Sequence, residues 1–269
     1  MRFYLVCVVL SLAHNIAGSC AEPLPIAYLD KIESMPDFCQ GDERFGLLPG
    51  HGSEACAPTA LSNTLIWLNG HGFSKLLANP KPTHADQAEL IRTLFKKDFL
   101  ATDEHTGTSP KHVVTGIENY LHAVGYECHI EQMGWRSSLH RIGKVPDETW
   151  LLKSCMGHSN CLINVGWYQR HEKTYQRVDG HWLTLVGFKE EHGHRTLYIH
   201  DPGKGSGIEK KTEPCQLNLL PKHHSLTLQN GETMNAEGYF ELKGILIRHG
   251  CDLAIIDGAV AFSPAVKSK

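Results

Sequence analysis

The period of the hydrophobic pattern changes near the middle of this chain, and that change restricts the folds open to it. In the first half, apolar side chains recur three and four residues apart, which is typical of helices with one buried face. Helices are predicted over residues 56–68, 85–97, 110–124 and 146–155. Short apolar segments bounded by turn residues then predict strands over residues 161–168, 181–189, 196–201, 225–229, 238–247 and 253–256. Helices followed by strands predict an α+β fold, with two lobes in one domain and a cleft between them.

The composition is that of a globular protein with a sizeable core. Of the 269 residues, 41% are hydrophobic and 20% are charged, and the net charge is -3 with histidines neutral. No basic stripe stands out, so the composition argues against a nucleic-acid partner. No segment has enough consecutive apolar residues to predict a transmembrane helix.

The N-terminal residues are typical of an export signal. Arg2 supplies a short positive region, an apolar run covers residues 3–12, and small residues gather before Glu22. We therefore predict a cleaved signal peptide over residues 1–21 and a secreted or periplasmic protein. In an alternative interpretation, acylation of Cys20 tethers the protein to a membrane as a lipoprotein.

The cysteine count agrees with export. Nine cysteines are present, and seven remain after Cys7 and Cys20 are removed with the leader. An exported protein tends to pair its cysteines, so six can pair and one stays free. The predicted pairs are Cys155 with Cys161, Cys215 with Cys251, and Cys39 with Cys128. No two cysteines have the C-x-x-C spacing of a zinc site, and neither a metal nor a cofactor is expected.

Cys56 stands at the predicted start of the first helix. The N-terminus of a helix has unpaired main-chain N–H groups and the positive end of the helix dipole, and both favour a thiolate. The same N–H groups can hold an oxyanion. A lone cysteine near an apolar helix is more often a small core residue, so the position alone does not assign catalysis.

His181 and Asp201 lie on two predicted strands that a turn near residue 192 joins. An antiparallel hairpin centred there places His181 opposite residues 202–203 and Asp201 beside it, within one residue of register. A carboxylate in that place can fix the imidazole tautomer and stabilise the imidazolium. Taken singly, an exposed histidine and a turn-forming aspartate are the more common interpretations.

The order of these three residues along the chain is more informative than any one of them. A cysteine on an early helix, followed by a histidine and an aspartate on a later hairpin, is the arrangement of papain-like enzymes. The sequence therefore predicts a catalytic centre that consists of Cys56, His181 and Asp201.

Three short segments resemble the bacteriocin-processing (double-glycine) leader peptidases and their secreted stand-alone relatives. The segment CAPTA at residues 56–60 is similar to their C-G-P-T-S/A motif, and GHW at residues 180–182 is similar to their G-H-[WF]-V motif. The segment HDPG at residues 200–203 resembles the end of a strand that carries their D-P-x-x-G motif. The resemblance covers residues 50–205, a little more than half of the chain.

The resemblance implies a papain-like cysteine peptidase fold, in which a helical N-terminal lobe packs on an antiparallel β-sheet lobe. It also implies a nucleophilic Cys56, His181 as the base, Asp201 as its orienter, and peptide or protein substrates. The predicted organisation is a signal peptide over residues 1–21, an N-terminal arm over 22–49, a peptidase domain over 50–205, and a β-rich extension over 206–269 packed on the same domain.

Two positions depart from the family pattern. The family usually has a glutamine five or six residues before the cysteine, where it donates to the oxyanion, and here those positions hold His51 and Gly50. The residue after the cysteine is Ala57 rather than glycine. We predict that the ring N–H of His51 replaces the missing glutamine donor. The alternative is that His51 is an exposed loop residue.

The leading functional prediction is an exported cysteine peptidase that hydrolyses peptide bonds through a thioester on Cys56. An acyltransferase of the transglutaminase type would use the same three residues but pass the acyl group to an amine. A catalytically inactive peptide-binding module on the same fold is the third hypothesis, and the missing glutamine favours it somewhat.

Overall fold

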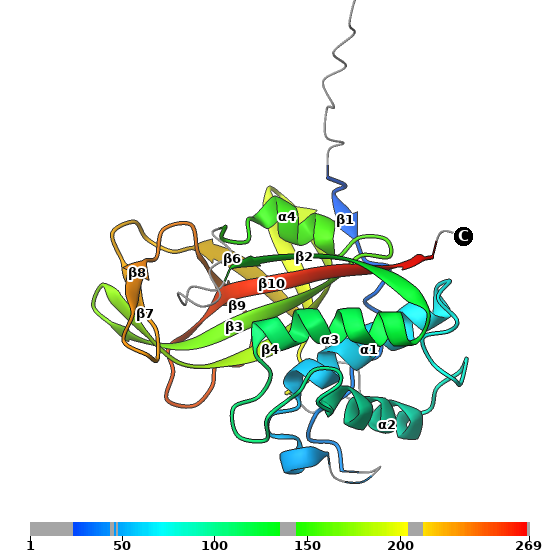
Figure 1. The fold of residues 1–269 in the computed structure, drawn as a ribbon. Coiled ribbons are helices and arrows are strands. Elements are labelled where there is room, and N and C mark those ends of the chain that lie inside the picture. Colours follow the sequence, from blue (N-terminus) through cyan, green and yellow to red (C-terminus); the bar gives the residue numbers. More distant parts are fainter. Residues whose placement is uncertain (1–23, 44–45, 47, 135–143, 204–211, 268–269) are drawn as a thin grey trace, which may run out of the picture.

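A computed structural model describes residues 24–43, 46, 48–134, 144–203 and 212–267. The predicted signal peptide and Cys20 lie outside the described residues, as does Gly205 at the end of the D-P-x-x-G segment. The described residues form four α-helices and a ten-stranded sheet, in which every strand pair is antiparallel except β4 with β7 (Figure 1). The predicted α+β class is confirmed.

All four predicted helices are present. They are α1 (Cys56–Gly70), α2 (His84–Phe95), α3 (Pro110–Ala123) and α4 (Glu148–Ser154). Side chains that cap the helix ends explain where three of them begin. Thr83 forms a capping box with Asp86 at α2, while Ser109 and Asp147 accept main-chain hydrogen bonds at the starts of α3 and α4.

The strands are β1 (Ala27–Tyr28), β2 (Tyr126–Gly134), β3 (Asn160–His171), β4 (Thr174–Glu191), β5 (His194–His200), β6 (Glu213–Leu219), β7 (Ser225–Thr227), β8 (Thr233–Asn235), β9 (Phe240–Lys243) and β10 (Leu253–Val266). Strands β3, β4 and β10 are longer than the predicted segments, whereas β7 and β9 are shorter. Strands β1, β2, β6 and β8 were not predicted, and β10 continues ten residues past the predicted end at residue 256. Apolar and polar residues alternate over the first part of β2, and its exposed positions are mostly charged or polar. This alternation is the signal that could have predicted the strand.

Strand β10 joins segments that are far apart in the sequence. It pairs with β2, β3 and β9, and further pairing from β9 through β6, β5 and β4 returns to β3. These six strands, from β3 to β6 with β9 and β10, therefore close into a ring. The last described segment of the chain completes the sheet that begins within residues 50–205.

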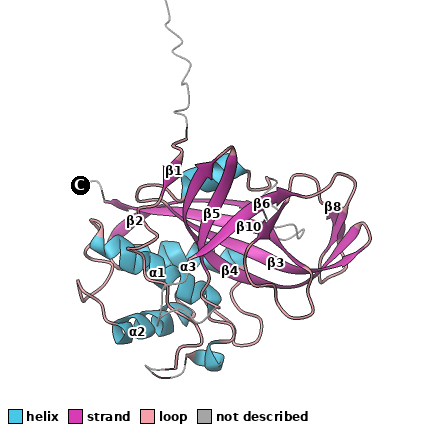
Figure 2. Ribbon diagram, turned by 180° about the vertical axis from the view of Figure 1, so that it is seen from behind, coloured by secondary structure: helices cyan, strands magenta, loops and turns pink. Residues whose placement is uncertain are grey.

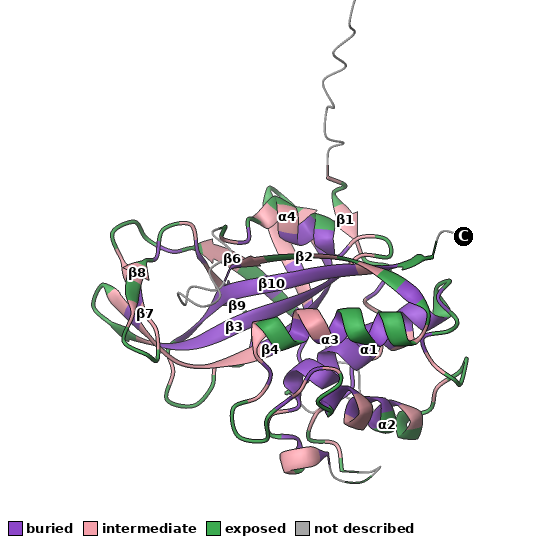
Figure 3. Ribbon diagram, viewed as in Figure 1, coloured by how far each residue is buried: buried purple, intermediate pink, exposed green. Residues whose placement is uncertain are grey.

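Helices cover the sheet on two sides. Helices α1, α2 and α3 lie on one side, while α4 and β1 lie on the other (Figures 1 and 2). On the first side, α1 and α3 share a core with Trp182 of β4 and Val260 of β10. On the second side, α4 packs over side chains such as Ile163 and Leu183. Strands β3 and β10 are buried along most of their length, whereas α3 has an exposed outer face (Figure 3).

The N-terminal arm contributes to the core. Lys31, Met35 and Phe38 are buried with at most 1% exposure. The Lys31 Nζ donates to Asn160 Oδ1 over 3.0 Å and lies 4.6 Å from the centre of the Trp67 ring. Burial lowers the pKa of Lys31 to about 8. The arm is thus fastened to both the sheet and α1.

All seven described cysteines are free thiols in the structure, so the three predicted disulfides stay a prediction. Cys155, Cys161 and Cys215 belong to one core cluster, and the partly buried Cys251 packs against it. Burial raises the pKa of Cys155 to about 12 and that of Cys161 well above its usual value. Neither buried thiol resembles a reactive thiolate. None of the described helices combines the length and apolar character needed to cross a bilayer.

Gly166 on β3 has no room for a side chain, which yields a stability prediction. A Cβ at residue 166 would overlap the Asp257 carboxylate and the Tyr168 ring. We expect Gly166→Ala to lower the free energy of unfolding by about 1–3 kcal/mol in urea denaturation, because the buried ring and carboxylate must move. Gly70→Ala at the end of α1 is the matched control, since a Cβ there meets nothing within 4 Å. Equal stability of Gly166→Ala and the wild type would contradict the prediction.

Candidate active site

The hairpin of β4 and β5 sets the relative positions of His181 and Asp201. Near the turn, Gly187 pairs with Tyr198, but beyond a bulge the next pair is Leu185 with Ile199. Continuing that register places His181 opposite Gly203, as predicted. It also places Asp201 two residues along on the same face of the hairpin.

His181 and Asp201 are joined by a short hydrogen bond. The His181 Nε2 lies 2.7 Å from Asp201 Oδ1, and the two side chains are only 13% and 5% exposed. The Gly203 main-chain N–H donates to the same carboxylate oxygen over 2.8 Å. A Cβ on Gly203 would come within 3.2 Å of His181 Nε2, so only glycine fits without displacing the ring.

Cys56 reaches the same histidine from the helical side. It is the first residue of α1, it is 8% exposed, and its side chain lies close enough to His181 to raise the pKa of the ring. Because Nε2 of the ring already bonds to Asp201, Nδ1 is the nitrogen that remains for Cys56. No acidic side chain occupies the first turn of α1, where the positive end of the helix dipole favours a negative charge.

These contacts make His181 a strong base. Burial by itself lowers the pKa of His181, but hydrogen bonds and charge interactions with Asp201 and Cys56 outweigh it and raise the pKa to about 10. With this pKa the ring is imidazolium at neutral pH.

Two side chains of β3 hold the histidine in place. Asn164 Nδ2 donates to the His181 main-chain oxygen over 3.3 Å. The Trp167 ring stacks on the imidazole, with ring centres 6.0 Å apart and planes inclined by 22°. The orientation of His181 is therefore set by both its main chain and its ring.

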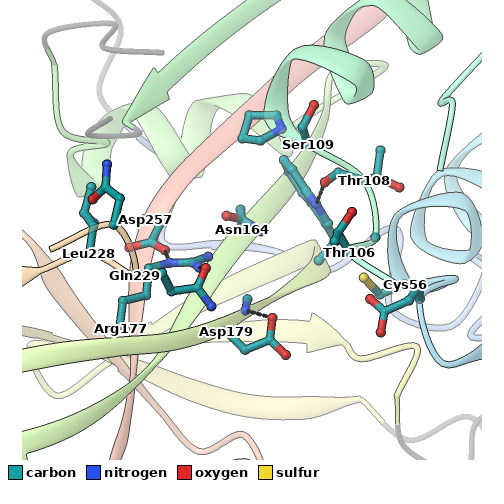
Figure 4. Close-up of a pocket in the computed structure, with 16 residues that line it drawn as sticks. Cys56, Thr106, Thr108, Ser109, Asn164, Arg177, Asp179, Leu228, Gln229 and Asp257 are labelled. Carbon is teal, nitrogen blue, oxygen red and sulfur yellow. Dashed lines mark hydrogen bonds and ion pairs between the residues drawn. The ribbon is translucent and has the colours of Figure 1, made fainter. Parts of the chain in front are cut away.

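A cleft of about 350 Å³ opens beside Cys56. Its walls are the 106–110 loop before α3, the 177–182 segment of β4, and the 228–230 loop between β7 and β8 (Figure 4). Trp182 Nε1 donates to the Thr108 main-chain oxygen over 3.1 Å and so ties the first wall to β4. Sequence reasoning predicted a cleft between the lobes but identified neither loop.

A buried polar network closes the end of the cleft opposite Cys56 (Figure 4). Arg177 Nε lies 2.7 Å from Asp257 Oδ2, while the Tyr168 hydroxyl donates to Asp257 Oδ1 over 2.6 Å. Burial disfavours the Arg177 cation, but Asp257 and Tyr168 more than compensate and raise its pKa. Nothing in the sequence near residue 257 indicated this role, because a bulge in β10 brings Asp257 to the cleft.

The structure brings Cys56, His181 and Asp201 together but does not bring His51 to them. His51 lies in the short 3-10 segment Pro49–Gly52 with a φ of 54°, and it is exposed. Its side chain is not part of the described lining of the cleft.

Sequence reasoning missed Gln40, which comes from the N-terminal arm. Its main-chain N–H donates to the Pro202 oxygen over 2.8 Å. Its side-chain Nε2 donates to the main-chain oxygens of Gly52 (2.8 Å) and Ser53 (3.0 Å), just before Cys56. Gln40 thus connects the loop of the aspartate with the loop of the cysteine. The family pattern places its glutamine five or six residues before the cysteine, whereas Gln40 lies farther upstream.

The described residues contain no group of three or more His, Cys, Asp or Glu side chains arranged to hold a metal ion. No protein-family model matches the sequence, and no curated protein matches it significantly. The assignment of chemistry therefore depends on the geometry of the site.

The raised pKa of His181 predicts a titration outside the usual histidine range. We expect the imidazole ¹⁵N resonances of His181 to titrate near pH 10, and Asp201→Asn to move that midpoint toward 6.5, because the carboxylate stabilises the cation. The folded-state pKa is the higher one. The stability from the charged ring is therefore complete below about pH 6.5 and disappears as the pH rises through about 10. A wild-type midpoint near 6.5 would contradict the ion pair.

Proposed function

We propose that this protein is an exported cysteine peptidase of papain-like type, with Cys56 as nucleophile, His181 as acid and base, and Asp201 as orienter. The observation that carries the proposal is His181 itself. It contacts the Asp201 carboxylate on one side and the Cys56 thiol at the N-terminus of α1 on the other. The resemblance of the sequence around these residues to the bacteriocin-processing leader peptidases supports the same chemistry.

The proposed reaction consumes only peptide and water. The Cys56 thiolate attacks the carbonyl carbon of the peptide bond and forms a C–S bond. As the tetrahedral intermediate collapses, the C–N bond breaks and the His181 imidazolium gives its proton to the leaving amine. Neutral His181 then takes a proton from water, which attacks the thioester. The acid product leaves, and Cys56 is restored.

An open strand edge beside the nucleophile favours an extended peptide as substrate. Strand β4 pairs with β7 over Thr174–Gln176 and with β5 over Thr184–Glu191. Between them, residues 177–180 pair only with β3 among the described strands, and the Val178 main-chain oxygen accepts from Gln229 Nε2. Residues 181–183 lie opposite residues 201–203 in the continued register of β5. Asp179 and Gly180 of this short edge line the cleft, where their main chain can pair with a peptide that runs along β4.

The oxyanion of the intermediate needs a donor in addition to the N–H groups at the start of α1. His51, proposed from the sequence, must turn its exposed ring toward Cys56 to serve. Gln40 already lies against the loop before Cys56, but both hydrogens of its amide bond to main-chain oxygens there. It can serve if one of these hydrogen bonds is exchanged for a bond to the oxyanion.

Acyl transfer to an amine remains a second candidate, because the same thioester can be attacked by an amine that occupies the cleft in place of water. The inactive peptide-binding module is supported less, since it would have no use for the His181–Cys56 contact. Product analysis with and without an added primary amine separates the first two functions.

The direct test is turnover combined with labelling. We expect the wild-type protein to cleave members of a random peptide library, and iodoacetamide to label Cys56 faster near neutral pH than the buried Cys155 or Cys161. Cys56→Ser and His181→Ala should lose activity by at least about three decades, because each removes a reacting group. Slow labelling of Cys56 together with no cleavage would refute the peptidase and leave a binding module.

Asp201→Asn and Asp201→Ala measure the role of the orienter. We expect Asp201→Asn to lower kcat by one to two decades, or about 1.4–2.7 kcal/mol, with a smaller effect on KM. The amide can still hold the ring but stabilises the imidazolium poorly. Unchanged kcat in Asp201→Ala would remove Asp201 from the site.

The two candidate oxyanion donors can be compared directly. The true donor, when replaced by alanine, should lower kcat by about two to three decades while iodoacetamide labels Cys56 at an unchanged rate, since alkylation forms no oxyanion. We expect this result for Gln40→Ala and near wild-type turnover for the exposed His51→Ala. The reverse outcome would restore His51, and His51→Gln should then retain activity. Loss of both turnover and labelling in Gln40→Ala would indicate that Gln40 only positions the Cys56 loop.

A further inference from the structure

The cleft beside Cys56 has more negative than positive side chains. Its lining includes the carboxylates of Glu54, Asp179 and Asp257 but only one guanidinium, that of Arg177. The Cys56–His181 pair adds no net charge in either of its proton arrangements. Because a cleft with protein walls concentrates the field of its charges, the carboxylates that lack a partner decide which substrates it attracts.

Two of the three carboxylates already have a cationic partner. Asp257 is buried and pairs with Arg177 over 2.7 Å. Asp179 forms an ion pair with Arg248 at the rim and also accepts from the Gly180 main-chain N–H over 2.8 Å. The charges of Asp179 and Asp257 are therefore locally balanced.

Glu54 is the carboxylate without such a partner. Among the described residues, no side chain forms an ion pair or hydrogen bond with it, and it is partly exposed in the wall of the cleft. Its carboxylate lies against Gly107, where a Cβ would approach Glu54 Oε2 to 3.0 Å. Because Gly107 has no side chain, the Glu54 carboxylate can lie close to the 106–110 loop in the wall of the cleft. Glu54 precedes the nucleophile by two residues, so the unbalanced charge is at the reactive end.

We propose that Glu54 makes the cleft selective for substrates with a cationic nitrogen, an ammonium or a guanidinium, close to the bond that is cleaved. Hydrogen bonds between such cations and a carboxylate are among the strongest in proteins, and partial burial of Glu54 reduces screening by water. The balanced Arg177–Asp257 pair at the other end offers no equivalent attraction. This inference names the substrate class of the proposed peptidase and rests on that function for its effect on turnover.

The cationic nitrogen can come from a Lys or Arg side chain or from a free peptide N-terminus. Peptides that are identical except for Lys, Gln or Glu at one position test the first source. The same peptides with free and acetylated N-termini test the second. A side-chain source predicts a preference for Lys over Gln and Glu. An N-terminal source predicts a preference for free over acetylated peptides.

The turnover experiment compares kcat/KM for these peptides in the wild type, Glu54→Gln, Glu54→Lys and the control Glu127→Gln. Glu127 is an exposed residue of β2 outside the lining of the cleft, so its variant makes the same change of charge elsewhere. We expect the wild type to prefer the cationic peptides by about tenfold or more, the preference to disappear in Glu54→Gln, and to reverse toward Glu-containing peptides in Glu54→Lys. Glu127→Gln should retain the wild-type preference.

Binding to Cys56→Ala, measured by calorimetry with the same peptides, gives a second result that does not need turnover. Preference for cationic peptides in Cys56→Ala, lost when Glu54→Gln is added, supports the inference even if the wild type cleaves nothing and the peptidase proposal fails. Cleavage of neutral and cationic peptides at equal rates overturns the inference but leaves the peptidase intact. Equal binding of all peptides to Cys56→Ala, or a cation preference that survives in both Glu54 variants, also overturns it.

Discussion

One extra residue in β4 decides whether the candidate site can form. From the turn to Gly187 the hairpin has one register, and the bulge at Val186 shifts it by a residue. Without that shift, Asp201 would stand opposite Thr184, whose side chain points away from the face that carries His181. With the shift, Asp201 lies on the face of His181 and the 2.7 Å hydrogen bond becomes possible. The contact of His181 with Cys56 depends on the same alignment, because Asp201 holds the ring.

The site is assembled from segments that are widely separated in the sequence. Cys56 comes from α1, His181 and Asp201 come from the β4–β5 hairpin and the residue after it, and the far wall of the cleft comes from β10 and the β7–β8 loop. The N-terminal arm adds Gln40 between the loops of Cys56 and Asp201. Strand β10 pairs with β2, β3 and β9. The cleft is therefore complete only when this last described strand has joined the sheet.

Charge is distributed unevenly along this cleft, and the distribution follows from burial. At the closed end, the buried Asp257 carboxylate pairs with Arg177 and accepts a hydrogen bond from Tyr168. An unpaired charge at this buried position would be costly. At the open end, Glu54 is partly exposed to solvent, and no side chain among the described residues pairs with it. Glu54 and Cys56 line the same part of the cleft, so a cationic group bound beside Cys56 would meet the one carboxylate of the described lining that lacks a cationic partner.

The sequence by itself determined the α+β class, the four helices and the three residues that meet at the site, because helical periodicity, turn residues and chain order are local signals. It also placed His181 opposite Gly203 from the turn alone, within one residue of register. Only the tertiary structure decided which face Asp201 takes, because a bulge leaves no clear local pattern. It alone placed Gln40 and Asp257, because hydrogen bonds across long stretches of chain depend on how distant segments pack and not on spacing along the sequence.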